Sequence, residues 1–227
     1  HKASERLAFK IGAQLIHAKD WIANDSSNYQ IGDAARSQYG GVKGGTRRSD
    51  PNYDGVNVYG DETSVDLRLL IPNVAAQIRP SIPAPAQPAF DAYVNALMGN
   101  PQLVSRTGYR ESDVVNNNTV NFRFSGGVYY KLTENIEASL AGTWGTGNTV
   151  YTGSDRYSLK DLKMGQYKLE FKHRDWFLRA YTTQENSGES YNATVTTRLF
   201  NEAWKPSVNF ANLAGSWYPQ YTGAFLL

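Results

Sequence analysis

Cysteine is absent from this sequence and histidine occurs only three times. A chain without cysteine has no disulfides and no thiol nucleophile, and so few imidazoles exclude most zinc sites. No nucleophile elbow, phosphate-binding loop or pair of metal ligands accompanies His17 or His173. The sequence therefore predicts that the protein is not an enzyme.

Charge of either sign is also scarce. Charged residues make up 19% of the chain and the formal net charge is only +2, which does not suit binding to nucleic acid. No run approaches the roughly 18 apolar residues of a membrane-spanning helix. The start, His1 to Glu5, has no apolar segment of the kind a signal peptide needs. A helical membrane protein is excluded, whereas a β-barrel is not, because its strands need only alternate apolar residues.

Aromatic residues and glycine are plentiful, with 15 Tyr, 9 Phe, 5 Trp and 20 Gly. Aromatic side chains fit a pleated surface, and glycine weakens helices. This composition predicts an all-β, antiparallel fold.

Four segments follow from the hydrophobic pattern. Residues 1–16 are interpreted as a first barrel strand, since apolar residues alternate from Leu7 to Leu15. Residues 17–118 lack this alternation and are predicted to form a long loop or insertion, with a proline-rich part at 79–101 and a short helix around Ala89 to Leu97. Residues 119–184 are predicted to be barrel strands in two hairpins, and 185–227 a loop and a truncated C-terminal part.

The first hairpin is expected to turn at Thr133 to Asn135. Alternate residues from Val120 to Leu132 and from Ile136 to Trp144 then share one apolar face. The expected cross-strand pairs are Leu132 with Ile136, Tyr130 with Ala138, Val128 with Leu140, Gly126 with Gly142, and Phe124 with Trp144.

The second hairpin is expected to turn at His173 to Asp175, with Leu169 opposite Leu178. Residues 146–163 are interpreted as a longer polar connection between the two hairpins. Short turns at one end and long loops at the other are typical of outer-membrane barrels.

The face opposite the apolar one is polar, as the lining of a barrel lumen would be. A soluble sheet with one face in water would show the same alternation. Aromatic residues near both strand ends, like the two girdles of a membrane barrel, favour the barrel. The charged residues on the polar face are Arg123, Lys131, Glu137, Lys168, Glu170, Lys172 and Arg179.

Several segments resemble the barrel region of TonB-dependent outer-membrane receptors of the Bacteroidetes type. They cover most of the chain apart from the proline-rich part. They are residues 20–25 (DWIAND), 52–62 (NYDGVNVYGDE), 130–138 (YKLTENIEA), 147–159 (GNTVYTGSDRYSL), 166–170 (QYKLE), 178–183 (LRAYTT), 185–188 (ENSG) and 201–205 (NEAWK).

The resemblance implies a location in the cell outer membrane and a barrel of about 22 strands closed by a plug domain. It also implies energy-coupled import of a nutrient, with the TonB system as a partner acting through the plug, outer-membrane lipids around the barrel, and a surface lipoprotein as a further candidate partner. The sequence shows no plug and no energy-coupling box, and only about five clear strands, fewer than the eight of the smallest barrels. We therefore expect a transmembrane β-barrel segment with long extracellular loops, part of a larger plugged barrel.

One segment has the spacing of a calcium loop. Asp50, Asn52 and Asp54 occupy alternate positions, Gly55 follows, and Asp61 stands at the twelfth position. Such oxygen ligands can wrap Ca²⁺, which is the one candidate cofactor. Turns rich in Asp, Asn and Gly also occur without metal, and the flanks are not amphipathic helices.

Ligand recognition is expected in the outer loops. Tyr151 and Tyr157 can stack on a sugar, haem or peptide, and Arg156 can pair with an anion. Trp144 is interpreted as a girdle residue. Two other functions stay open: a barrel component that holds partners in an outer-membrane complex, and a soluble β-sandwich that binds carbohydrate.

Overall fold

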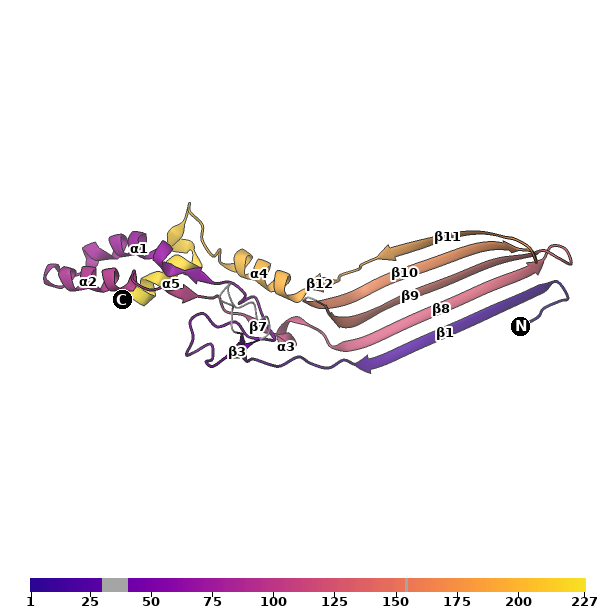
Figure 1. Ribbon diagram of the computed structural model, residues 1–227, viewed down its shortest axis with the longest axis horizontal. Coiled ribbons are helices and arrows are strands. Elements are labelled where there is room, and N and C mark those ends of the chain that lie inside the picture. Colours follow the sequence, from indigo (N-terminus) through magenta and orange to yellow (C-terminus); the bar gives the residue numbers. More distant parts are fainter. Residues whose placement is uncertain (30–40, 154) are drawn as a thin grey trace. The chain divides into compact units, whose positions relative to one another are not determined.

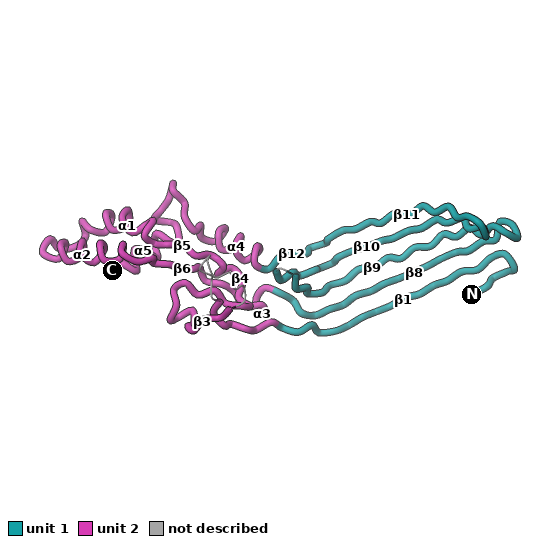
Figure 2. Tube along the Cα trace, in the orientation of Figure 1, with its two compact units in different colours: residues 1–22, 115–193 teal, residues 23–114, 194–227 magenta. Residues whose placement is uncertain are grey.

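The computed structural model describes residues 1–29, 41–153 and 155–227. The chain divides into two compact units, and each is formed by segments distant in sequence (Figure 2). Unit 1 comprises residues 1–22 and 115–193, and unit 2 comprises residues 23–114 and 194–227. Among the described residues, no helix combines the length and the apolar character needed to cross a membrane.

Unit 1 is built on one antiparallel sheet of long strands (Figure 1). In spatial order these are β1 (Leu7–Lys19), β8 (Asn118–Lys131), β9 (Glu137–Thr152), β10 (Arg156–Lys172) and β11 (Phe177–Asn186). The short strand β12 (Tyr191–Asn192) pairs with the start of β10. Over the described residues the sheet is open, because β1 and β11 each have one long-strand neighbour. The antiparallel β prediction is confirmed, and the part of the chain that the structure describes forms no closed barrel.

The register of the first hairpin matches the prediction. Tyr130 lies opposite Ala138, and Phe124 lies opposite Trp144. Leu132 donates its backbone N–H to the carbonyl of Ile136 over 2.9 Å, which closes the turn. The pattern predicted this register because slipping by one residue would move every apolar side chain to the polar face.

The register of the second hairpin was predicted wrongly. Ala180 lies opposite Leu169, while Leu178 lies opposite Phe171. The turn is longer than expected, since the N–H of His173 donates to the carbonyl of Trp176 over 2.8 Å. The pairing is displaced by two residues from the predicted one, so Leu169 and Leu178 still share a face but are not opposite each other.

The prediction of a long polar connection at 146–163 is also wrong. Strands β9 and β10 continue through this segment and meet at a short turn after Thr152, of which Ser154 lies outside the described residues. One bulge between Leu159 and Leu162 interrupts the β10 ladder. Threonine, asparagine and glycine in this segment resemble loop composition, but their backbone groups pair in the sheet like those of any strand.

Unit 2 contains helices that the all-β prediction did not include. They are α1 (Ile71–Ile78), α2 (Gln87–Leu97), α3 (Glu111–Val114), α4 (Ala193–Trp204, whose first residue belongs to unit 1) and α5 (Trp217–Leu226), with 3-10 turns at Leu67–Leu69, Arg79–Ser81, Ala84–Ala86 and Leu213–Gly215. Helix α2 confirms the expected helix at 89–97. Helices α4 and α5 lie where 185–227 was expected to be loop.

The described residues of unit 2 also form three pairs of two-residue strands: β2 (Asn28–Tyr29) with β3 (Val42–Lys43), β4 (Val58–Tyr59) with β7 (Tyr109–Arg110), and β5 (Val65–Asp66) with β6 (Leu103–Val104). Residues 30–40 of the predicted loop lie outside the described residues.

The hydrophobic core of unit 2 explains why much of 17–118 is ordered rather than loop. Leu67 and Ile71 are fully buried and pack with Val104 and Tyr218. These residues come from both sequence segments of the unit. No local hydrophobic periodicity predicts such a core, because each segment contributes only a few apolar residues to it.

Candidate functional site

The apolar face of the sheet in unit 1 is exposed along its whole length. Most large apolar side chains on it are at least 36% accessible, and Leu15 and Leu140 exceed 60%, whereas Phe171 is only partly exposed. Soluble monomers rarely expose apolar patches of more than a few hundred Å². This face includes Leu7, Phe9, Ile11, Leu15, Val120, Phe122, Phe124, Val128, Tyr130, Leu140, Trp144, Tyr167, Leu169 and Leu178.

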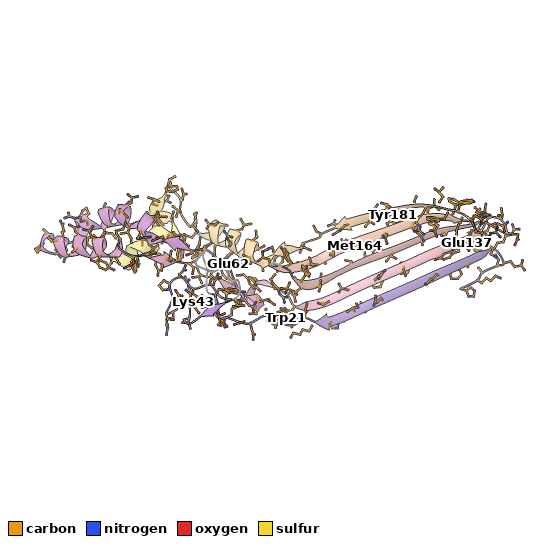
Figure 3. All side chains as sticks on the ribbon, viewed as in Figure 1. Trp21, Lys43, Glu62, Glu137, Met164 and Tyr181 are labelled. Carbon is orange, nitrogen blue, oxygen red and sulfur yellow. The ribbon has the colours of Figure 1, made fainter. Side chains whose placement is uncertain are left out.

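The opposite face carries ion pairs and small residues. Glu170 accepts from Arg179 on the neighbouring strand and from Lys168 over 3.4 Å, so these charged groups pair along the sheet. Figure 3 marks Glu137 on this face near the short turns and Met164 further along β10. The charges predicted for this face therefore partly neutralise one another.

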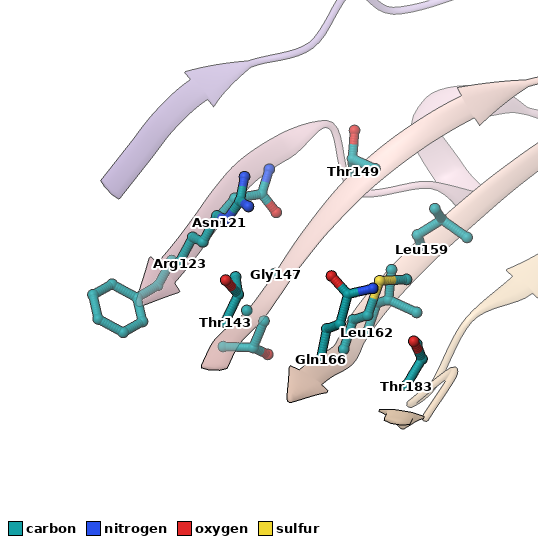
Figure 4. A pocket seen from close by; sticks show the side chains of 13 residues that line it. Asn121, Arg123, Thr143, Gly147, Thr149, Leu159, Leu162, Gln166 and Thr183 are labelled. Carbon is teal, nitrogen blue, oxygen red and sulfur yellow. The ribbon is translucent and has the colours of Figure 1, made fainter. Parts of the chain in front are cut away.

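A hollow of about 430 Å³ lies over β8, β9 and β10. Gly145 and Gly147 contribute no side chains there, while Asn121, Arg123 and Gln166 line the hollow (Figure 4). Its other polar lining comes from threonines, and Arg123 is the ionised group, but most of the lining is apolar and includes Phe122, Leu159, Leu162 and Met164. Such a surface can contact apolar groups and also donate and accept hydrogen bonds.

Two of the three residues predicted to bind ligand lie together at the far end of the sheet. Tyr151 and Tyr157 are opposite each other on β9 and β10, with ring centroids 6.0 Å apart. Tyr151 is 55% exposed. The pair sits at the ends of paired strands, not in the long loop that the sequence predicted.

Arg156 is not available in the way that the prediction requires. Its side chain is 4% exposed and donates to the hydroxyl of Thr152 over 2.6 Å and to the carbonyl of Trp21 over 3.3 Å. The guanidinium also stacks on the Trp21 ring, 4.6 Å from its centroid. Arg156 therefore fastens the segment after β1 to the start of β10, within unit 1. The sequence did not single out Trp21 for this contact, because 135 residues separate the two.

The predicted calcium loop lies in unit 2, and its first residue already has cationic and amide partners. The Asp50 carboxylate accepts from Lys43 over 2.6 Å and from Asn28 over 2.7 Å. Burial opposes ionisation here, but these hydrogen bonds hold the pKa of Asp50 below its usual value. Asp50 is thus a paired carboxylate.

Asp61 and Asp54 have a different environment. Asp61 is fully buried, and one of its oxygens accepts from the N–H of Gly55 over 3.2 Å while the other has no hydrogen-bond partner. Burial, together with the charges of Asp54 and Glu62, raises the pKa of Asp61 to about 7. Burial, followed by the charge of Glu62, raises the pKa of Asp54 to about 6. Of these carboxyl groups, Asp61 therefore keeps its proton closest to neutral pH.

The fit of this loop to a metal ion is incomplete. The side-chain oxygen of Asn52 is buried without a partner, as one oxygen of Asp61 is. Across residues 1–29, 41–153 and 155–227, however, no three His, Asp or Glu side chains are arranged to hold a metal ion. Calcium at Asp50, Asn52, Asp54 and Asp61 stays a prediction from sequence spacing.

Two charged residues that the sequence did not single out shape unit 2. Arg106 is 2% exposed and donates to Glu202 over 3.1 Å and to the carbonyls of Asn201 and Lys205. Glu111 is fully buried and accepts from the hydroxyl of Tyr59 over 3.0 Å. Neither stands in a recognisable motif, since their partners are distant in sequence.

Comparison of the chain with protein-family models, with curated proteins and with solved structures finds no match.

Proposed function

We propose that this chain forms part of the wall of an outer-membrane β-barrel, and that the barrel is a TonB-dependent receptor for energy-coupled uptake of a nutrient. The observation that carries the proposal is the sheet of unit 1, which has one exposed apolar face and one polar face. In water the apolar face is unfavourable, whereas against lipid it is the solvated side.

The dimensions of the apolar face suit a bilayer. On β8 and Leu132, which directly follows it, the face runs from Val120 to Leu132, both more than 40% exposed. Twelve residues at about 3.4 Å each extend about 41 Å along the strand. Tilted by about 40°, as strands of membrane barrels are, they span about 31 Å across the membrane. The hydrocarbon core of a bilayer is about 30 Å thick.

The polar face suits the inside of such a barrel. Its ion pairs, and the polar groups Asn121, Arg123 and Gln166 at the hollow, would face water or a plug domain. The further strands needed for closure would come from outside the five long strands seen here. The barrel would have outer-membrane lipids around it and the TonB system as its partner through the plug.

The transport half of the proposal rests on the resemblance of the segments from 130–138 to 185–188 to the barrel region of TonB-dependent receptors. Tyr151 and Tyr157 remain the best candidates for contact with the nutrient, because their rings are paired and Tyr151 is exposed.

A second candidate function, holding a partner in an outer-membrane complex, is supported by helix α4. Val195, Leu199, Phe200 and Trp204 on this helix are each at least 49% exposed, which is typical of a binding surface. A surface lipoprotein is the candidate partner. This role predicts a stoichiometric partner that copurifies in detergent. The soluble sandwich has less support, because the described residues of unit 1 form one sheet and not two packed sheets.

A matched pair of arginine substitutions tests the membrane wall. Ala180 and Tyr181 are neighbours on β11, both exposed, and lie on the apolar and polar faces respectively. Arginine facing lipid near the bilayer centre costs about 2–4 kcal/mol. We expect Ala180→Arg to reduce the amount of folded protein in outer membranes strongly, and Tyr181→Arg to reduce it little. Fractionated membranes and detergent-extracted folded protein provide the measurement. Equal tolerance of both variants would contradict the proposal.

A further inference from the structure

The sheet register arranges the lining of the 430 Å³ hollow in rows across the strands. Each of two adjacent rows has a glycine on β9 between a polar residue on β8 and an apolar residue on β10 (Figure 4). The rows are Arg123, Gly145 and Met164, followed by Asn121, Gly147 and Leu162. Because neighbouring strands lie about 4.8 Å apart, the polar and apolar walls are about 10 Å apart. The hollow is therefore a trough with a glycine floor, one polar wall and one apolar wall.

The two glycines keep the floor of the hollow empty, for different reasons. A Cβ at Gly147 would collide with the side-chain oxygen of Asn121. A Cβ at Gly145 would lie at ordinary contact distances, 3.4 Å from the carbonyl oxygen of Phe122 and 4.0 Å from the Cβ of Arg123. Glycine at position 147 is thus required by its neighbours, whereas Gly145 leaves space that a larger side chain can fill.

One irregularity in β10 extends the apolar wall. Between Leu159 and Leu162 the strand has one more residue than β9 has opposite it, which makes a β-bulge. Since side chains alternate along a strand, the bulge turns Leu159 to the same face as Leu162. Tyr157, opposite Tyr151, is the next residue of β10 on that face. Without the bulge, Leu159 and Tyr157 would lie on the apolar face of the sheet.

The bulge is fixed by the segment that follows β11. The carbonyl of Lys160 accepts from the N–H of Glu189 over 2.9 Å. The N–H of Lys160 donates to the hydroxyl of Ser190 over 3.1 Å. A Cβ at Gly188 would collide with the carbonyl oxygens of Lys160 and Asp161, so this close approach requires glycine. The bulge is a built feature of the fold, as bulges that re-aim side chains beside functional sites are.

The polar side of the hollow carries hydrogen-bonding groups that the chain itself leaves unused. Among the described residues, the guanidinium of Arg123 has no ion-pair partner, and the side-chain amides of Asn121 and Gln166 make no hydrogen bond. By contrast, Arg179 on the same face is paired with Glu170. A guanidinium without a partner suits a carboxylate, which it binds through two parallel N–H donors.

The rest of the lining suits an apolar body. Leu159, Leu162 and Met164 all lie on the otherwise polar face, and Met164 is 46% exposed. Small-molecule sites are hollows of about 300–1,000 Å³ with mostly apolar walls and a few placed polar groups. The hollow has both the volume and the lining of such a site.

We propose that this hollow binds a small amphipathic carboxylate. The carboxylate pairs with Arg123, and the apolar body lies against Leu162 and Leu159. The rings of Tyr151 and Tyr157 contact its far end, since they follow Leu159 on the same face. The inference deepens the proposed function and rests on it for the role of this molecule as the imported nutrient.

Calorimetric titration of the full chain in nonionic detergent tests the proposal. The probe is hydrocinnamate, and its uncharged amide, hydrocinnamamide, is the matched compound; titration into empty micelles subtracts partitioning. We expect the carboxylate to bind about tenfold more tightly than the amide, because only the carboxylate forms a charge-assisted pair with Arg123. Arg123→Gln should remove this preference and leave the affinity for the amide nearly unchanged. Absence of binding, equal affinities, or a preference that persists in Arg123→Gln would overturn the proposal.

A variant that fills the hollow gives an independent readout. Gly145→Leu places a side chain on the floor, and Ala141→Leu is the matched control on the same strand and face but outside the hollow. We expect Gly145→Leu to abolish binding of both probes and Ala141→Leu to retain it. Binding that survives Gly145→Leu, or is lost equally in both variants, would contradict the site.

Failure of this site and failure of the membrane wall are distinguishable. Loss of the site with the expected difference between Ala180→Arg and Tyr181→Arg would leave the wall in place. Binding by a protein that tolerates both arginines would keep the site and reject the wall.

Discussion

At the scale of single residues, Asp61 shows how burial changes a carboxylate that sequence spacing presents as a metal ligand. Its side chain is fully buried beside Gly108, where a side chain would bring its Cβ within 2.8 Å of the Asp61 carboxyl carbon. The backbone of residue 108 can approach only because it is glycine. The burial of the Asp61 carboxyl group, with one oxygen unpartnered, favours its neutral acid form.

Asp61 should make stability depend on pH. The pKa of Asp61 is about 7 in the folded protein, and 3.8 is the usual value that applies to the unfolded chain. Between these two pH values only the folded state binds the proton. Stability contributed by this group is then complete below about pH 4 and is lost as pH rises through 7. The shift corresponds to at most roughly 4 kcal/mol. We expect the drop in unfolding free energy from pH 5 to pH 8 to be smaller in Asp61→Asn than in the wild type.

The matched control is Asp113→Asn, at an exposed position of α3, which should keep the wild-type pH dependence. Denaturant unfolding of unit 2 followed at both pH values provides the measurement. Asp54, with a pKa of about 6, should leave some pH dependence in the Asp61 variant. An Asp61→Asn profile identical to the wild type would show that the buried carboxyl is not the titrating group.

At the scale of structural elements, the first hairpin was predictable because two local signals agree. Strict alternation fixes which side chains share a face, and the short turn fixes the register. The Thr133 hydroxyl stabilises that turn by accepting from the N–H groups of Asn135 and Ile136, at 3.3 and 3.1 Å.

Replacing this hydroxyl by a methyl group, which keeps the size of the side chain, should destabilise the hairpin. We expect Thr133→Val to lower the unfolding free energy by about 1 kcal/mol, the usual net worth of a hydrogen bond, and Thr133→Ser to lower it less. Urea unfolding in detergent micelles, with tryptophan fluorescence as the signal, measures the difference. Equal stability of the valine and serine variants would mean that the hydroxyl does not hold the turn.

The second hairpin and the ends of β9 and β10 were predicted less well for different reasons. In the second hairpin, registers that differ by two residues keep the same side chains on each face, so alternation does not choose between them. At the ends of β9 and β10, most residues on both faces are polar or small, so alternation carries little signal there. Turn length is then decided by backbone hydrogen bonds such as that from His173 to Trp176. The position of Arg156 on a strand, and its burial against Trp21, follow from this longer pairing.

At the scale of the whole molecule, the two units divide the chain so that neither is a continuous segment. The core of unit 2 joins Leu67 and Ile71 to Tyr218 and Leu226. Arg106 connects the same segments through Glu202 and Asn201. Most of the stretch expected as a loop is therefore a folded unit with its own core.

The receptor proposal predicts a whole-cell phenotype. Cells that lack the protein should lose uptake of one scarce nutrient, and collapse of the proton-motive force should abolish that uptake in wild-type cells. Tyr151→Ala should reduce uptake without lowering the amount of folded protein, because Tyr151 is 55% exposed at a strand end. Arg123→Ala, which removes a charged side chain from the hollow of the polar face, serves as a comparison variant in the same uptake assay. Uptake that persists without a proton-motive force would contradict energy coupling.

The sequence by itself determined the antiparallel strands, the two faces of the sheet and the register of the first hairpin. These follow from period-two alternation, which can be recognised within a short stretch of the sequence. Tertiary structure alone decided that residues 23–114 and 194–227 fold together and that Arg156 and Asp61 are buried. The reason is that burial and pairing depend on groups far apart in the chain, and local patterns do not record which distant groups will meet.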